Sequence, residues 1–92
     1  MERGGLVYVC DDTEQIRRLI RLNLELEGYD VVEAADGQHL LDQLREAQEL
    51  PGVITLDAQM TPRDGWWAIG RIRADPRLAG ASIGVLRKPA CA

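Results

Sequence analysis

The stretch from Val53 to Asp57 places the strongest constraint on the fold, because four apolar or β-branched residues run directly into an aspartate. A run without polar alternation is typical of a strand that is buried on both faces, as in a parallel sheet. Pro62 and the pair Asp64-Gly65 follow, and these residue types favour a turn. Asp57 is therefore predicted to lie at the carboxyl end of a buried strand, where open α/β sheets hold their ligands.

Three further apolar runs alternate with amphipathic segments along the chain. Strands are expected at about 6–10, 29–34, 53–57 and 81–86, and helices after Thr13 to about 27, at about 38–48 and at about 66–74. This β-α-β-α-β-α-β order implies parallel strands joined by right-handed crossovers. We therefore expect residues 1–92 to form a single α/β domain with a doubly wound parallel sheet. The first strand is followed by Asp11-Asp12-Thr13 in place of glycines, which argues against dinucleotide binding.

Charge and composition exclude several classes of function. Lys and Arg together number 11, Asp and Glu number 15, and the net charge is −4, so the chain offers no basic surface for direct nucleic acid binding. No apolar run approaches the length of a membrane span, and the first residues lack the apolar core of a signal peptide. The two cysteines do not form a metal-binding pattern, so we expect a cytoplasmic protein with reduced thiols.

The helical segments carry apolar residues at helical spacing. In the first helix, Leu22 and Leu26 flank the main stripe, so this apolar arc either meets another helix or forms an exposed patch. The polar residues of the same helix are interpreted as a solvated charged face: Arg17, Arg18, Arg21 and Glu25. In the third helix, Trp66 shares a stripe with Ile69 and Ile72 and is predicted to be core, whereas Trp67 points elsewhere.

Three acidic residues are expected to meet at one edge of the sheet. Asp11 and Asp12 end the first strand and Asp57 ends the third, and these strands are neighbours in a doubly wound sheet. Their mutual repulsion is relieved by a hard divalent cation, and Mg²⁺ suits carboxylate ligands. A carboxylate beside Mg²⁺ can attack phosphorus. The alternative is that these aspartates are solvated caps and turn residues.

Several motifs together resemble the receiver domain of two-component response regulators, which has a flavodoxin-like fold. They are Val9-Cys10-Asp11-Asp12, Gly28-Tyr29-Asp30-Val31 with Ala35-Asp36-Gly37, Leu56-Asp57 through Met60 to Asp64-Gly65, and Lys88-Pro89. The resemblance implies that Asp57 accepts a phosphoryl group from a sensor histidine kinase or phosphotransfer protein. It also implies a Mg²⁺ site formed by Asp11, Asp12, Asp57 and the main-chain carbonyl of Gln59. Lys88, just past the fourth strand, is a candidate contact for a phosphoryl oxygen.

The chain departs from the family pattern in three ways. Thr61 stands where the family usually has proline, and Arg87 stands where it has the Ser or Thr that senses phosphorylation. The family's last strand and two helices are also missing from this sequence. We therefore expect the fourth strand to be an open edge and the sheet beside the first helix to be uncovered, which favours a homo-oligomer through either surface.

The resulting hypothesis is a receiver domain that is not itself an enzyme and that signals by altered protein association. The main alternative is a pseudo-receiver that binds partners without being phosphorylated, with Arg87 satisfying the acids. A Mg²⁺-dependent phosphatase would require a second acid where Gln59 stands. A shortened gene product is a further possibility.

Overall fold

The computed structural model describes residues 5–57, 65–78 and 80–86. Its sheet has four parallel strands in the order β2-β1-β3-β4. The strands are β1 (Leu6–Cys10), β2 (Asp30–Ala34), β3 (Val53–Asp57) and β4 (Ser82–Leu86). The predicted α/β fold with a doubly wound parallel sheet is confirmed, and β2 is at one edge of the described sheet, as its more polar sequence indicates.

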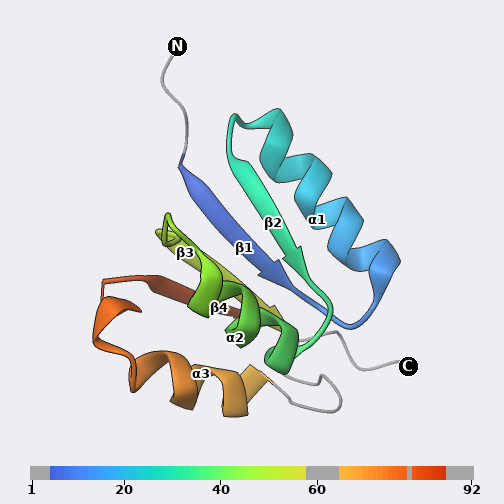
Figure 1. The fold of residues 1–92 in the computed structure, drawn as a ribbon. Helices are drawn as coiled ribbons and strands as arrows, with labels where there is room; N and C mark the ends of the chain where they lie inside the picture. Colours follow the sequence, from blue (N-terminus) through green and yellow to red (C-terminus); the bar gives the residue numbers. More distant parts are fainter. Residues whose placement is uncertain (1–4, 58–64, 79, 87–92) are drawn as a thin grey trace.

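Helices connect successive strands on opposite faces of this sheet (Figure 1). They are α1 (Glu14–Leu26), α2 (Gly37–Glu46) and α3 (Gly65–Arg73), with a 3₁₀ turn η1 (Pro76–Leu78) before β4. Figure 1 shows α2 and α3 side by side on one face and α1 on the other. None of the helices in the described ranges is long and apolar enough to cross a membrane.

Local sequence signals explain where the helices begin and end. Gly28 has a φ of +94°, and its N–H donates to the carbonyl of Glu25 at 3.0 Å, so it ends α1 in the left-handed conformation that glycine adopts most readily. The side chain of Asp36 accepts a hydrogen bond from the N–H of His39 at 2.8 Å and so caps the start of α2. These two signals bound the connection from α1 through β2 to α2.

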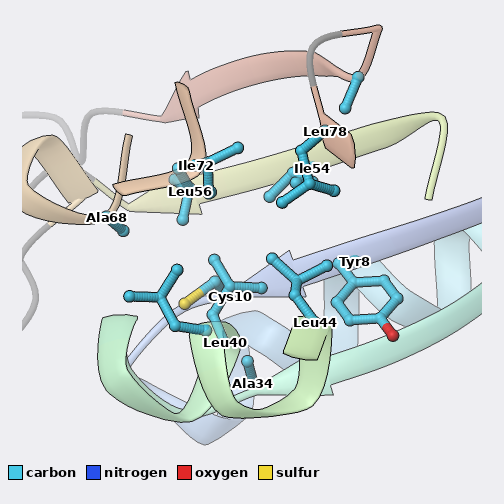
Figure 2. Packing of buried hydrophobic residues seen from close by; sticks show 12 residues of the cluster. Tyr8, Cys10, Ala34, Leu40, Leu44, Ile54, Leu56, Ala68, Ile72 and Leu78 are labelled. Carbon is cyan, nitrogen blue, oxygen red and sulfur yellow. The ribbon is translucent and has the colours of Figure 1, made fainter. Parts of the chain in front are cut away.

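The hydrophobic core lies between the sheet and the pair α2 and α3. Figure 2 shows Leu40 and Leu44 of α2 facing Ile54 and Leu56 of β3, and all four are fully buried. The other face differs, because no residue of α1 is fully buried. Three leucines of α1 are exposed: Leu19, Leu22 and Leu26. The wide apolar arc predicted for this helix is therefore an exposed patch in the described part of the chain.

The prediction that Trp66 is core is wrong. Its side chain is 54% exposed, whereas Trp67 is partly buried against the core. Ala68 and Ile72, four residues apart, form the buried face of α3. Trp66 precedes Ala68 by two residues and so points about 200° around the helix from that face. The guanidinium of Arg71 lies over the Trp67 ring, 5.5 Å from its centre, in a cation–π contact.

Candidate metal and phosphoacceptor site

The register of the sheet brings three carboxylates to one edge. Cys10 of β1 is paired with Leu56 of β3, so Asp11 and Asp57 follow at the same level on adjacent strands. One carboxylate oxygen from each of Asp11, Asp12 and Asp57 lies within 4.8 Å of the others. The three acids that the sequence predicts to converge are thus next to one another at the carboxyl edge of the sheet.

The three acids differ in their exposure to solvent. Asp11 is 2% exposed and Asp57 is 1% exposed, whereas Asp12 is exposed. Burying a carboxylate is costly unless a cation or hydrogen-bond donors compensate it. The cluster therefore combines two buried carboxylates with one that is exposed to solvent.

Hydrogen bonds fix the main chain that carries Asp11. Its N–H donates to the carbonyl of Ala34 at 3.2 Å, which extends the β1–β2 pairing by one residue. Its Oδ1 accepts from the N–H of Thr13 at 2.8 Å, and Arg17 Nη1 donates to its carbonyl at 2.9 Å. The Thr13 hydroxyl is 3.4 Å from Asp12 Oδ1. The turn between β1 and α1 therefore sets the direction of the first two acids.

The cysteine next to this cluster is chemically quiet. Burial raises the pKa of the Cys10 thiol to about 12, and the negative charges of Asp36 and Asp11 add to the increase. A thiol with this pKa stays protonated near neutral pH, and only the thiolate acts as a nucleophile or metal ligand. The carboxylates are thus the reactive groups at this edge among the described residues.

The donor set fits a hard divalent cation. Carboxylate oxygens are the preferred ligands of Mg²⁺ and Ca²⁺. Two oxygens bound to one Mg²⁺ lie at most about 4.2 Å apart, twice the usual Mg–O distance. The 4.8 Å limit of this cluster therefore accommodates one ion after a small side-chain movement, or with one carboxylate bound through a water molecule.

Three residues of the predicted site fall outside the described residues. These are Gln59, the expected carbonyl ligand, Arg87, which stands in the place of Ser or Thr, and Lys88, the expected phosphoryl contact. Their parts in the site stay predictions.

A pair of residues beside the acids is not evident from the sequence pattern. Arg17 is only partly exposed and pairs with Glu33 of β2, instead of belonging to a solvated charged face. Arg21 of the same helix also bonds Glu33. A sequence signal existed in the spacing of Arg17 and Arg21, which places both on one side of α1. Their partner is on the next strand, so local spacing could not identify it.

Comparison with known proteins identifies relatives of this chain. A family model described as the response regulator receiver domain matches residues 7–86. A probable transcriptional regulator from Guillardia theta is 38% identical over 75 residues, which cover 82% of this chain and 29% of that protein. A DNA-binding dual master transcriptional regulator from Synechocystis is 35% identical over 77 residues, covering 84% of this chain and 31% of that protein. The chain thus spans about three tenths of the length of these relatives.

Solved structures share the same architecture. A response regulator receiver protein from Pseudomonas putida superposes with a TM-score of 0.84 at 30% identity, covering 99% of this chain and 73% of that one. A chemotaxis response regulator from Vibrio cholerae superposes with a TM-score of 0.85 at 26% identity, covering 95% of this chain and 71% of that one. A Thermotoga maritima response regulator solved in complex with Mg²⁺ and BeF superposes with a TM-score of 0.81 at 27% identity, covering 92% of this chain and 70% of that one.

Proposed function

This chain belongs to the response regulator receiver domain family, and on that premise we propose that Asp57 accepts a phosphoryl group with the help of Mg²⁺. The donor is a sensor histidine kinase or a phosphotransfer protein, and the ion is held by Asp11, Asp12, Asp57 and the carbonyl of Gln59. The observation that carries this proposal is the approach of three carboxylates to within 4.8 Å at the carboxyl edge of the sheet. The Thermotoga relative, whose complex contains Mg²⁺ and BeF, supports the choice of ion.

The chemistry assigned to this chain is a single phosphoryl transfer. A carboxylate oxygen of Asp57 attacks phosphorus, the bond between phosphorus and the donor breaks, and its electron pair leaves with the donor. Mg²⁺, when bound, neutralises charge on the transferring phosphoryl group. Asp11 and Asp12 hold the ion and do not take part in bond making. Lys88 is proposed to contact a phosphoryl oxygen, as its resemblance to the family's Lys-Pro motif implies.

We propose that the output is altered protein association and that the chain is not itself an enzyme. The exposed leucines of α1, Leu19, Leu22 and Leu26, support self-association with a second copy, and the outer edge of β4 is a second candidate surface. The net charge of −4 supports the absence of direct nucleic acid binding by this segment. The DNA binding named for the Synechocystis relative is a property of a much longer chain. A cytoplasmic location is part of the same proposal.

A direct test of phosphorylation uses a small phosphodonor such as acetyl phosphate. The wild-type chain and the Asp57→Ala variant are incubated with the donor and Mg²⁺, and intact mass is measured. We expect one added phosphoryl group in the wild type, none in the variant, and none when EDTA removes the metal. If the wild type gains no mass and does not bind beryllofluoride, the proposal fails and the chain is a pseudo-receiver that works by constitutive binding.

Self-association has a separate test. Gel filtration with light scattering over a range of concentrations measures the oligomer, and Leu22→Ser with Leu26→Ser removes most of the exposed leucine surface. We expect a dimer that the double variant disrupts. The proposal is contradicted if the wild type stays monomeric at high concentration both in the absence and in the presence of beryllofluoride.

A further inference from the structure

A charged network joins α1 to β2 beside the acid cluster. Glu33 on β2 binds two arginines that are one helical turn apart on α1: Arg17 Nε lies 2.9 Å from Oε1, and Arg21 Nη1 lies 2.7 Å from Oε2. The side chains of Arg17 and Glu33 are only 15% and 19% exposed. The hydrogen bond from Arg21, together with the one from Arg17, lowers the pKa of Glu33, so this carboxylate is ionised at neutral pH.

Arg17 extends this network to the acid cluster. Its Nη1 donates to the carbonyl oxygen of Asp11 at 2.9 Å while its Nε is bonded to Glu33. A guanidinium is planar and presents its donors in a fixed fork, so holding one side of it directs the other. Glu33 thereby orients Arg17, and Arg17 fixes the carbonyl of Asp11.

The main chain at Asp11 is consequently held from two directions. Its N–H is bonded to Ala34 of β2, and its carbonyl is bonded to Arg17 of α1. The direction of a side chain follows from the main chain that carries it, and a small misplacement of a metal ligand weakens binding. Partners that orient metal ligands typically contribute 10- to 100-fold to metal affinity.

We infer that Arg17, oriented by Glu33, is a positioning residue that holds Asp11 in the geometry required to bind the divalent cation. This inference rests on the proposed function, because it concerns the same metal site. The charge of Arg17 has the opposite effect, since a nearby cation repels Mg²⁺ through space. A positioning role and a purely electrostatic role therefore predict changes of opposite sign when Arg17 is removed.

The experiment is a calorimetric titration of each variant with Mg²⁺ under conditions in which circular dichroism shows a folded chain. Positioning predicts that Arg17→Met weakens Mg²⁺ binding about tenfold, the lower limit for such partners. Glu33→Gln weakens binding in the same direction, and the double variant is no weaker than Arg17→Met alone, because both changes break one chain of contacts. Arg18→Met is the matched control and leaves affinity unchanged, since exposed Arg18 pairs only with Glu14 among the described residues.

Arg17→Lys separates geometry from charge and remains informative if Arg17→Met fails to fold. Lysine keeps the charge but lacks the fork that bonds Glu33 and the Asp11 carbonyl together, so we expect affinity to stay at least about threefold below that of the wild type. Tighter or unchanged binding by Arg17→Met, or full affinity in Arg17→Lys, overturns the inference while the proposed function stands. If the wild type itself binds no Mg²⁺, the proposed function fails first.

Discussion

Replacing Asp57 with asparagine should stabilise the metal-free protein while abolishing its proposed reaction. With an effective dielectric constant of about 20, two unit charges at the 4.8 Å limit repel by about 3.5 kcal/mol. Water screens the exposed Asp12, so the buried pair of Asp11 and Asp57 dominates. Asparagine has nearly the same shape and removes one of those charges. Both residues make further contacts that also act on their charges, so about 3.5 kcal/mol is the upper limit of the expected rise in the free energy of unfolding.

Urea unfolding followed by circular dichroism, in EDTA and in Mg²⁺, measures this effect. In EDTA the Asp57→Asn variant should unfold at a higher urea concentration than the wild type with the same slope. Saturating Mg²⁺ should then stabilise the wild type more than the variant, which has lost a ligand. Asp42→Asn, on the surface of α2, is the control and should change stability by less than about 0.5 kcal/mol. The charge argument is refuted if Asp57→Asn is no more stable than the wild type in EDTA.

Three further predictions follow from burial and charge. Leu40→Ala should lower the free energy of unfolding by about 2–5 kcal/mol, whereas Glu46→Ala, at an exposed position of α2, should change it by less than about 0.5 kcal/mol, and equal losses in urea titrations would contradict the assigned core. Glu33 should stabilise the folded protein by at most about 1 kcal/mol at pH values above its ordinary pKa of 4.5. This stabilisation should be lost as the pH falls through the lower pKa that Glu33 has in the folded protein. Wild type and Glu33→Gln should therefore converge in stability at acidic pH, and a constant gap from pH 7 to pH 3 would exclude this linkage. In the Cys91→Ser variant, the Cys10 thiol should react with a thiol reagent at pH 8 no faster than the protein unfolds locally or globally. Rapid stoichiometric labelling of the folded protein would contradict the raised pKa of Cys10.

The sequence predicts features that depend on local pattern and on general rules of topology. The apolar run ending at Asp57 gives a strand in which Ile54 and Leu56 are buried but Val53 is exposed, Gly28 gives a helix end, and the rule for doubly wound sheets brings Asp11 beside Asp57. Two features depend on information that is not local. The first is the rotational phase of α3, which determines whether Trp66 or Trp67 faces the core. In a helix of nine residues, a shift of one position turns each side chain by about 100°.

The contact between Arg17 and Glu33 shows the second kind of limit. The two residues are 16 positions apart and meet only because α1 crosses back over β2. From sequence alone, each reads as an ordinary surface charge. Their partial burial and shared hydrogen bonds appear only when the helix and strand are placed together.

The two faces of the sheet differ in how deeply their helices are buried, and the acid cluster depends on both. On the α2 and α3 face, fully buried side chains such as Leu40 and Ile54 give a close-packed core. On the α1 face no helix residue is fully buried, and the ion pairs of Glu33 with Arg17 and Arg21 connect the helix to β2. Asp57 ends a strand of the well-packed core, whereas the carbonyl of Asp11 is held by an arginine of the less buried helix. The position of α1 against the sheet therefore affects the relative position of these two carboxylates, and with it the affinity for a cation between them.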